Sequence, residues 1–306
     1  MPGTDGAPAP TLGSAVLVHP WVHRSAGGVE VGPETPSGDP SPAPVAFVAA
    51  LRLTWELREL LWALVLKDFK SRYRAHALGL FWSLAHPLVM MVTLTIAFQQ
   101  VMRIAIENFA VFYLVGSVFW HFFTNATLAA LGSLVENGGL VKQTTFPRFL
   151  FPIAAVLSHL VHFGMELALV FSFMLVFPDA YHLNASLVGL PILTLLVLVI
   201  AAGAALATAG LHVKYRDVHY VVTSLFTVGF WATPILYPLD MAPAPLRAVI
   251  RLNPLTGVIE GARAIILRGV FPSALDLVPA AVTGVTLFLL GCAIFRRQNL
   301  HVADYL

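Results

Sequence analysis

Six apolar runs, each long enough to cross a membrane, alternate with short polar stretches along most of the chain. They lie at about 78–98, 109–131, 151–177, 187–211, 220–236 and 275–295. A spanning helix needs roughly 20 apolar residues, because lipid offers no partners to unpaired backbone N–H and C=O groups. The pattern therefore predicts an all-α integral membrane protein with six transmembrane helices.

The segment before the first apolar run has the pattern of a helix with one apolar face. Its leucines recur three and four residues apart, at Leu53, Leu57, Leu60, Leu61 and Leu64. Trp55 and Trp62 add a residue type that favours the boundary between membrane and water. The pattern over 53–66 therefore predicts an amphipathic amino-terminal helix that lies at the membrane interface.

Basic residues predict how the spans are oriented. Four cations follow the amphipathic helix, at Lys67, Lys70, Arg72 and Arg74. Basic residues gather on the cytoplasmic side, so we expect a multi-pass protein of the cytoplasmic (inner) membrane with both termini in the cytoplasm. Four arginines within 238–272 conflict with this orientation, because the same topology places them outside.

The segment 238–272 has a pattern that accounts for these arginines. Two apolar stretches, at 246–250 and 255–267, flank Asn253 and Pro254, and neither is long enough to cross. We expect a re-entrant helical hairpin between the fifth and sixth spans, entering from the outer face, with positions near Thr256 reachable from outside. Gly257 and Gly261, four residues apart, would allow close helix approach. Glu260 and Arg263, three residues apart, could form an ion pair within this exit hairpin.

Composition excludes a soluble domain and several kinds of site. Charged residues make up 11% of the chain, against about a quarter in soluble domains, and the mean hydropathy is +0.80. The cations lie at membrane boundaries, so lipid headgroups explain them better than nucleic acid does. The single cysteine, Cys292, excludes an intrachain disulfide and a zinc cluster built on cysteines. We expect no metal site.

Residues 1–46 differ from the rest of the chain, being rich in proline, glycine, alanine and serine. Such a segment buries too little apolar surface to offset the entropy lost on ordering, so we expect a disordered cytoplasmic tail. Residues 47–306 are expected to form one six-span transmembrane domain.

Helix breakers bound a short polar segment between the second and third spans. Gly138 and Gly139 precede it, and Pro147 and Pro152 follow. The pattern predicts a short cytoplasmic helix, which suits docking against a partner, although an ordinary loop is an alternative.

Four motifs in this order resemble the permease subunit of ABC transporters that export polysaccharides. The motifs are KDFKSRYR with LGLFWSLAHP (67–87), LVKQTTFPR (140–148), YRDVHY with TPILYP (215–238) and NPLTGVIEGAR (253–263). The resemblance covers about residues 50–300. Phe149 departs from it, because an acidic residue is usual at that position.

The resemblance implies a transport subunit rather than an enzyme. Such subunits move a lipid-linked polysaccharide of the O-antigen, capsule or teichoic-acid type across the cytoplasmic membrane, as homodimers bound to two copies of an ATPase subunit. The chain itself contains no G-x-x-x-x-G-K phosphate loop, so ATP and magnesium are expected on the partner ATPase and no cofactor on this chain.

Four groups of residues are assigned roles on the basis of the sequence and this resemblance. The expected ATPase-coupling residues are Leu140, Val141, Lys142, Phe146, Pro147 and Arg148. The expected uptake site for the lipid pyrophosphate is Lys70, Arg72, Arg74, Lys214 and Arg216. The expected channel lining, offering aromatic faces to sugar rings or alternatively contacting lipid, is Trp82, Phe119, Trp120, Phe123, Phe230, Trp231 and Tyr237. The exit hairpin adds Asn253, Pro254, Gly257, Glu260 and Arg263.

Ionisable residues within the third predicted span suggest a different chemistry. His159, His162 and Glu166 share one helix face, and such groups are costly in lipid. A polar seam packed against another helix is the favoured interpretation, with a proton relay and a metal site as alternatives. A drug or small-lipid ABC exporter and a proton-coupled carrier are the rival functions. The carrier would require this histidine–glutamate face. A membrane-embedded transferase is disfavoured, because no acid and base groups converge at one depth.

Overall fold

The computed structural model describes residues 57–73, 79–104, 106–143, 147–176 and 184–299. The chain divides into residues 1–39 and 40–306, and the first unit lies outside the described residues. The predicted disordered tail therefore stays a prediction. All regular secondary structure in the described ranges is helical, as the apolar pattern predicted.

Helices follow one another with short connections. In chain order they are α2 (Arg58–Tyr73), α3 (Gly79–Thr95), the π-helical η1 (Ile96–Val101), α4 (Phe109–Glu136), α5 (Gly138–Gln143), α6 (Leu150–Val176), the 3-10 helix η2 (Ala185–Gly189), α7 (Leu190–Lys214), α8 (Val218–Ala232), η3 (Leu239–Met241), α9 (Ala244–Arg251), α10 (Pro254–Ile266) and α11 (Ala274–Asn299).

Five helical segments are long and apolar enough to cross a membrane. They are Leu84–Val101, Phe109–Glu136, Leu150–Val176, Ala185–Lys214 and Leu277–Gln298, and they match five of the six predicted runs. The run predicted at 220–236 instead contains α8, which has only 15 residues. The helix stops because Thr233 precedes Pro234, and a residue before proline is driven out of the helical region into the extended conformation it has here.

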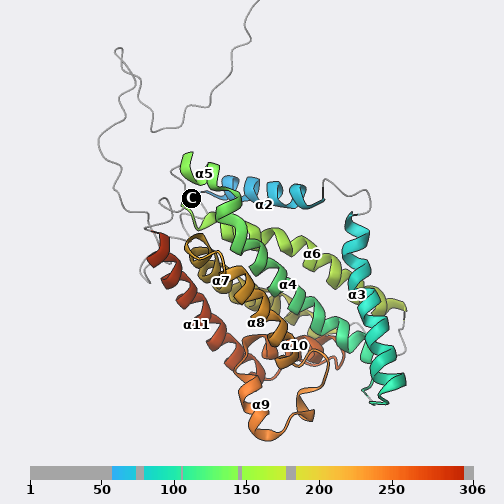
Figure 1. Ribbon diagram of the computed structural model, residues 1–306. Helices are drawn as coiled ribbons and strands as arrows, with labels where there is room; N and C mark the ends of the chain where they lie inside the picture. Colours follow the sequence, from blue (N-terminus) through green and yellow to red (C-terminus); the bar gives the residue numbers. More distant parts are fainter. Residues whose placement is uncertain (1–56, 74–78, 105, 144–146, 177–183, 300–306) are drawn as a thin grey trace, which may run out of the picture. The chain divides into compact units, whose positions relative to one another are not determined.

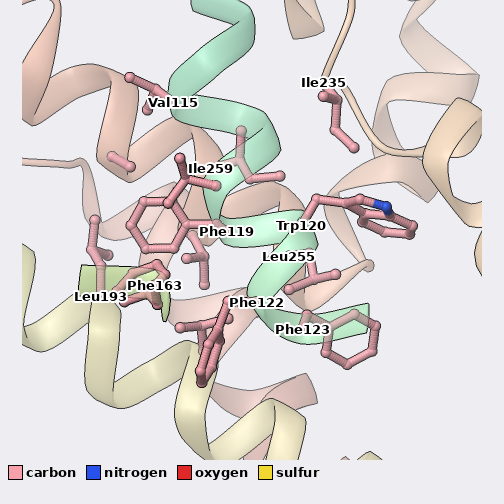
Figure 2. Packing of buried hydrophobic residues seen from close by; sticks show 14 of the residues in the cluster. Val115, Phe119, Trp120, Phe122, Phe123, Phe163, Leu193, Ile235, Leu255 and Ile259 are labelled. Carbon is pink, nitrogen blue, oxygen red and sulfur yellow. The ribbon is translucent and has the colours of Figure 1, made fainter. Parts of the chain in front are cut away.

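The centre of the bundle is α4. In the most apolar stretch of α4, 78% of the residues are buried, against 11% in Leu84–Val101, which covers the later part of α3 and η1. Figure 2 shows the aromatic packing around α4, where Phe119 and Phe122 of α4 lie against Phe163 of α6. The ring centroids of these two contacts are 5.2 and 5.0 Å apart. Offset and edge-on contacts of this kind stabilise aromatic pairs beyond the area they bury.

Small residues allow α7 and α11 to approach closely. A Cβ added to Gly291 of α11 would lie 2.1 Å from the carbonyl oxygen of Gly203 in α7. A Cβ added to Gly203 would lie 2.6 Å from the Cα of Phe288. Backbone packing of this kind supplies van der Waals contact where lipid removes any hydrophobic drive between helices.

Helix α2 crosses one end of the bundle, close to α5, whereas α9 lies at the opposite end (Figure 1). Helix α2 packs on α6, with Leu64 and Val65 buried and Trp62 exposed. Residues 53–56 lie outside the described ranges. The amphipathic helix was expected to end at residue 66, before the basic residues. Instead α2 continues to Tyr73 through Lys67, because lysine and arginine are good helix formers and cations favour a helix carboxyl end.

Candidate functional site

A buried arginine joins three parts of the chain at the α9–α10 end of the bundle. Arg263 of α10 is 2% exposed. Its guanidinium donates to the carbonyl oxygens of Pro234 (2.6 Å) and Ile235 (2.9 Å), which follow α8. It also donates to the carbonyl oxygen of Phe112 in α4 at 3.4 Å and lies 3.5 Å from the centroid of that ring.

The predicted ion pair of Arg263 is confirmed. Its Nη1 lies 2.8 Å from Oε1 of Glu260, one helical turn earlier. The guanidinium thus has one carboxylate and three backbone carbonyls as acceptors. Its planar fork offers five N–H donors on three nitrogens, whereas a lysine ammonium offers three donors from a single nitrogen. Arg263 therefore organises the non-helical segment after α8.

The turn between α9 and α10 depends on Asn253. Its side-chain oxygen accepts a bond from the N–H of Leu255 (3.0 Å), so it caps α10, and Pro254 occupies the first helical position. Its amide nitrogen donates to Oγ1 of Thr233 at 2.8 Å. The turn is therefore tied to the end of α8, and Gly257 is buried within α10.

Positions near Thr256 were expected to be reachable from outside, but Thr256 itself is buried. Thr256 is 2% exposed, because α10 packs into the bundle against α4, α7 and α11. Exposed residues at this end instead include Val249 and Leu252, at the end of α9.

A polar pocket of about 340 Å³ adjoins Arg263, and we call it the α10 pocket. It lies between the segment before α4, the segment after α8, and α10. Its lining residues are Ile106, Glu107, Asn108, Phe112, Pro238, Leu239, Asp240, Glu260, Arg263, Leu267 and Arg268. Glu107, in the turn before α4, and Asp240, in the 3-10 helix η3, were not predicted as site residues, because neither belongs to a periodic pattern or a motif.

The predicted coupling segment forms a short helix at the α2 end. Helix α4 ends at Glu136, and the break lies at Asn137 rather than at the glycines, which begin α5. Lys67 of α2 donates a hydrogen bond to the side-chain oxygen of Asn137. In α5, Val141 packs into a cluster with Leu64 and Val65 of α2. Helices α2, α4 and α5 therefore meet at this point.

The other coupling residues are distributed around this junction. Leu140 and Lys142 are exposed on α5, whereas Pro147 is buried and Arg148 half-buried. Phe146 lies outside the described residues. Phe149, which stands where an acidic residue is usual, is buried in the same apolar cluster as Leu64 and Val65 of α2. It therefore belongs to the packing of this end.

The cations expected to take up a lipid pyrophosphate are not equivalent. Lys70, Lys214 and Arg216 are exposed, and Lys214 Nζ lies 5.1 Å from the Tyr215 ring centroid. Arg72 instead turns toward α6, with Nη2 3.5 Å from Nδ1 of His159. Arg74 lies outside the described ranges.

Asp68 adds a carboxylate to the same face of α2. Burial raises its pKa, against the opposing effect of Lys67 and Arg72.

The histidine–glutamate face of α6 packs against α4. Oε1 of Glu166, whose side chain is 2% exposed, lies 3.3 Å from Nε2 of His162 and 3.5 Å from Nδ1 of His121. Nδ1 of His159 lies 2.9 Å from the carbonyl oxygen of Ala155. This arrangement fits the favoured interpretation of a packed polar seam. Its α4 member, His121, was missed because only the fold brings it to Glu166.

The predicted channel-lining residues fall into two groups. Phe119, Trp120 and Phe123 are buried within one chain, and Trp120 and Phe123 pack against Phe226 of α8 at 6.4 and 5.3 Å. Phe230 and Tyr237 are half-buried, and Trp231 is 64% exposed. The Trp82 side chain lies outside the described part of the structure. Trp231 thus presents a ring outward, whereas Phe119 belongs to the core.

These observations define a multi-pass helical membrane protein with a junction of short helices at one end and a two-helix cap at the other. The ABC-2 type transporter family model matches residues 59–267, about two thirds of the chain. The chain therefore belongs to the ABC-2 type transporter family.

The chain can be aligned over most of its length with several permeases and transport proteins. An O-antigen export system permease protein RfbA from Klebsiella pneumoniae is 30% identical over 250 residues, 82% of this chain and 96% of its own. A protein of the same name from Myxococcus xanthus is 28% identical over 262 residues, 84% of this chain and 99% of its own. The polysialic acid transport protein KpsM of Escherichia coli is 23% identical over 241 residues, 78% and 92% of the two chains.

Proposed function

We propose that this chain is the transmembrane subunit of an ATP-driven exporter that moves a lipid-linked polysaccharide across the cytoplasmic membrane. The observation that carries the proposal is its similarity, over nearly their whole length, to permeases named for O-antigen and polysialic acid transport. The chain serves as a transport component, and ATP hydrolysis belongs to a separate ATPase subunit, as in the ABC-2 type. O-antigen, capsule and teichoic-acid polymers are all candidate cargoes.

We further propose six crossings, the fifth being formed by α8 and the segment after it. A helix of 15 residues reaches about 22 Å, short of the roughly 30 Å of a bilayer core. Residues 233–236 follow α8 as a buried, non-helical turn, and we assign the rest of the crossing to them. Non-helical backbone at this depth needs internal partners, and Arg263 provides them for Pro234 and Ile235.

The α2–α5 end is assigned to the cytoplasm and the α9–α10 end to the outer face. Lys70, Lys214 and Arg216 are exposed at cytoplasmic boundaries in this orientation, and both termini are cytoplasmic. Helix α2 then lies at the inner interface as the predicted amphipathic helix. The pair α9–α10 becomes the re-entrant hairpin, with Arg263 bonded inside the protein rather than facing lipid.

Two copies of the chain are proposed to enclose the path of the polymer, each bound to one of two ATPase subunits. Support comes from α8, in which only Val222 is buried, and from the exposed ring of Trp231. A second copy would cover this face and bring Phe230, Trp231 and Tyr237 toward the path. On the cytoplasmic side, Leu140 and Lys142 of α5 would meet the ATPase, and the exposed cations of α2 and α7–α8 would receive the lipid pyrophosphate.

The function is tested by deleting the gene and measuring the glycan at the cell surface, with the intact gene restored as the control. Loss of surface glycan, accumulation of lipid-linked glycan inside, and recovery on complementation are expected. Purified chain with its ATPase should hydrolyse ATP faster when the accumulated lipid-linked glycan is added. Unchanged surface glycan would refute the proposal, and stimulation by small amphipathic drugs alone would favour the rival exporter.

A proton-coupled carrier is separated from an ABC exporter by the energy source. Export should persist when the proton gradient is collapsed and ATP is maintained. Export that stops under those conditions would instead favour the carrier and assign a relay to Glu166.

A further inference from the structure

The α10 pocket combines groups of both charge signs within about 340 Å³. Glu107, Asp240 and Glu260 contribute carboxylates, and Arg263 and Arg268 contribute guanidinium groups. The volume lies within the range of about 300–1,000 Å³ typical of small-molecule sites. A pocket of this composition presents hydrogen-bond acceptors and donors side by side.

The charged groups of the pocket differ in how far they are committed to the fold. The Arg263 guanidinium is occupied by backbone carbonyls and by Glu260, so it forms a fixed wall. The Asp240 side chain is 91% exposed and lies 3.7 Å from Arg247. Glu107 and Arg268 are exposed as well. Three charged side chains therefore remain in reach of a ligand without being part of the packing.

Apolar surfaces complete the lining. Phe112, Leu239 and Leu267 lie between the charged residues, together with Ile106. Pockets that bind small molecules commonly combine such surfaces with a few placed polar groups. A ligand that fits this lining must offer both C–H faces and hydrogen-bonding groups.

One wall of the pocket has an unusual backbone. Asn108 has φ 52°, in the left-handed region, which asparagine adopts more readily than most other non-glycine residues. In this conformation it precedes α4 without making a side-chain cap bond, and it lines the pocket. Unusual backbone of this kind persists where the surrounding structure holds it, and it gathers at ligand sites.

We propose that the α10 pocket binds a neutral sugar unit of the exported glycan on the outer side of the membrane. A singly charged ligand would meet like charges there, whichever its sign. Sugar hydroxyls can donate to Asp240 and Glu107 and accept from Arg268, while the ring's C–H face rests on apolar side chains. This assignment rests on the proposed function, because that function brings a glycan to this end.

Saturation-transfer NMR on the purified full chain in lipid nanodiscs tests the proposal directly. The probes are glucose, galactose, mannose, rhamnose and N-acetylglucosamine, with glucuronate, glucosamine and phosphoethanolamine as charged and zwitterionic comparators. At least one neutral sugar should give a signal that falls at least fivefold in Asp240→Asn and in Arg268→Gln. The controls Asp217→Asn and Arg251→Gln remove exposed charges outside the pocket and should keep the signal.

A protection experiment checks the same site without relying on loss of binding. Asp240→Cys in a Cys292→Ala background should react with an impermeant thiol reagent added from outside. The neutral sugar that gives the NMR signal should slow this reaction, whereas Leu252→Cys, outside the pocket, should react at an unchanged rate.

Several outcomes would overturn the sugar site. They are no signal from any neutral sugar, equal signals in pocket variants and controls, or binding only of glucuronate, glucosamine or phosphoethanolamine. Binding of phosphoethanolamine alone would assign the pocket to a lipid headgroup. The polysaccharide function stands or falls separately, because it depends on surface glycan in the deletion strain and not on binding to this pocket.

Discussion

Replacing Arg263 with alanine should be among the most damaging single changes in the protein. The substitution removes the donors to the carbonyls of Phe112, Pro234 and Ile235, and it leaves the Glu260 carboxylate without its partner. A buried polar group that loses its hydrogen-bond partner costs about 1–3 kcal/mol, and breaking a buried ion pair costs about 3–5 kcal/mol. We therefore expect a loss of at least about 4 kcal/mol of unfolding free energy.

A graded series separates the ion pair from the carbonyl bonds. Arg263→Lys should retain part of the stability, because an ammonium can reach Glu260 but cannot serve the carbonyls and the Phe112 ring together. Glu260→Ala should cost less than Arg263→Ala, because three carbonyls still hold the guanidinium. It should nevertheless reduce export more than Glu136→Ala, whose carboxylate is exposed at the end of α4.

The series is measured by reversible unfolding of the purified protein in mixed micelles, followed by circular dichroism. Arg251→Ala is the matched control, because Arg251 is an exposed arginine at the same end. The reasoning fails if Arg263→Ala lies within about 1 kcal/mol of Arg251→Ala, since a solvent-exposed ion pair is worth no more than that. An Arg263→Lys variant as stable as the wild type would show that charge alone matters.

Further expectations concern the seam, the α7–α11 contact and the cytoplasmic end. Glu166→Ala should destabilise the bundle by roughly 1–3 kcal/mol. Export at the wild-type rate in Glu166→Gln would support a packed seam and exclude a proton relay. Gly291→Ala should reduce folded yield sharply, because its Cβ would meet the Gly203 carbonyl, whereas Gly139→Ala, with nothing within 4 Å, should not. Arg148→Ala should uncouple ATP hydrolysis from export without loss of insertion, and unchanged coupling would contradict this. Replacing Lys70, Lys214 or Arg216 singly with Gln should weaken the binding of lipid-linked glycan only by about 1 kcal/mol per cation. The triple Gln variant should lose most of this binding. Wild-type binding by the triple variant would refute the site.

Several features of this protein follow from local sequence alone. Five of the six predicted crossings match helices long enough to cross, because a run of about 20 apolar residues has few alternatives to a helix in lipid. The turn at Asn253–Pro254 is set by an asparagine that caps α10 and a proline that begins it. The pairing of Glu260 with Arg263 follows from helical spacing. Each of these predictions depends on residues close together in the chain.

Other features exist only because distant segments meet. Arg263 bonds to the carbonyl of Phe112, 151 residues away, and no pattern in the sequence marks that carbonyl as an acceptor. His121 meets Glu166, Arg72 turns to His159, and Thr256 is buried rather than reachable. Backbone acceptors are the same at every position, and a helical face does not specify its neighbour. The partners of a charge in this bundle are therefore decided by packing, whereas the apolar length of a segment decides whether it crosses.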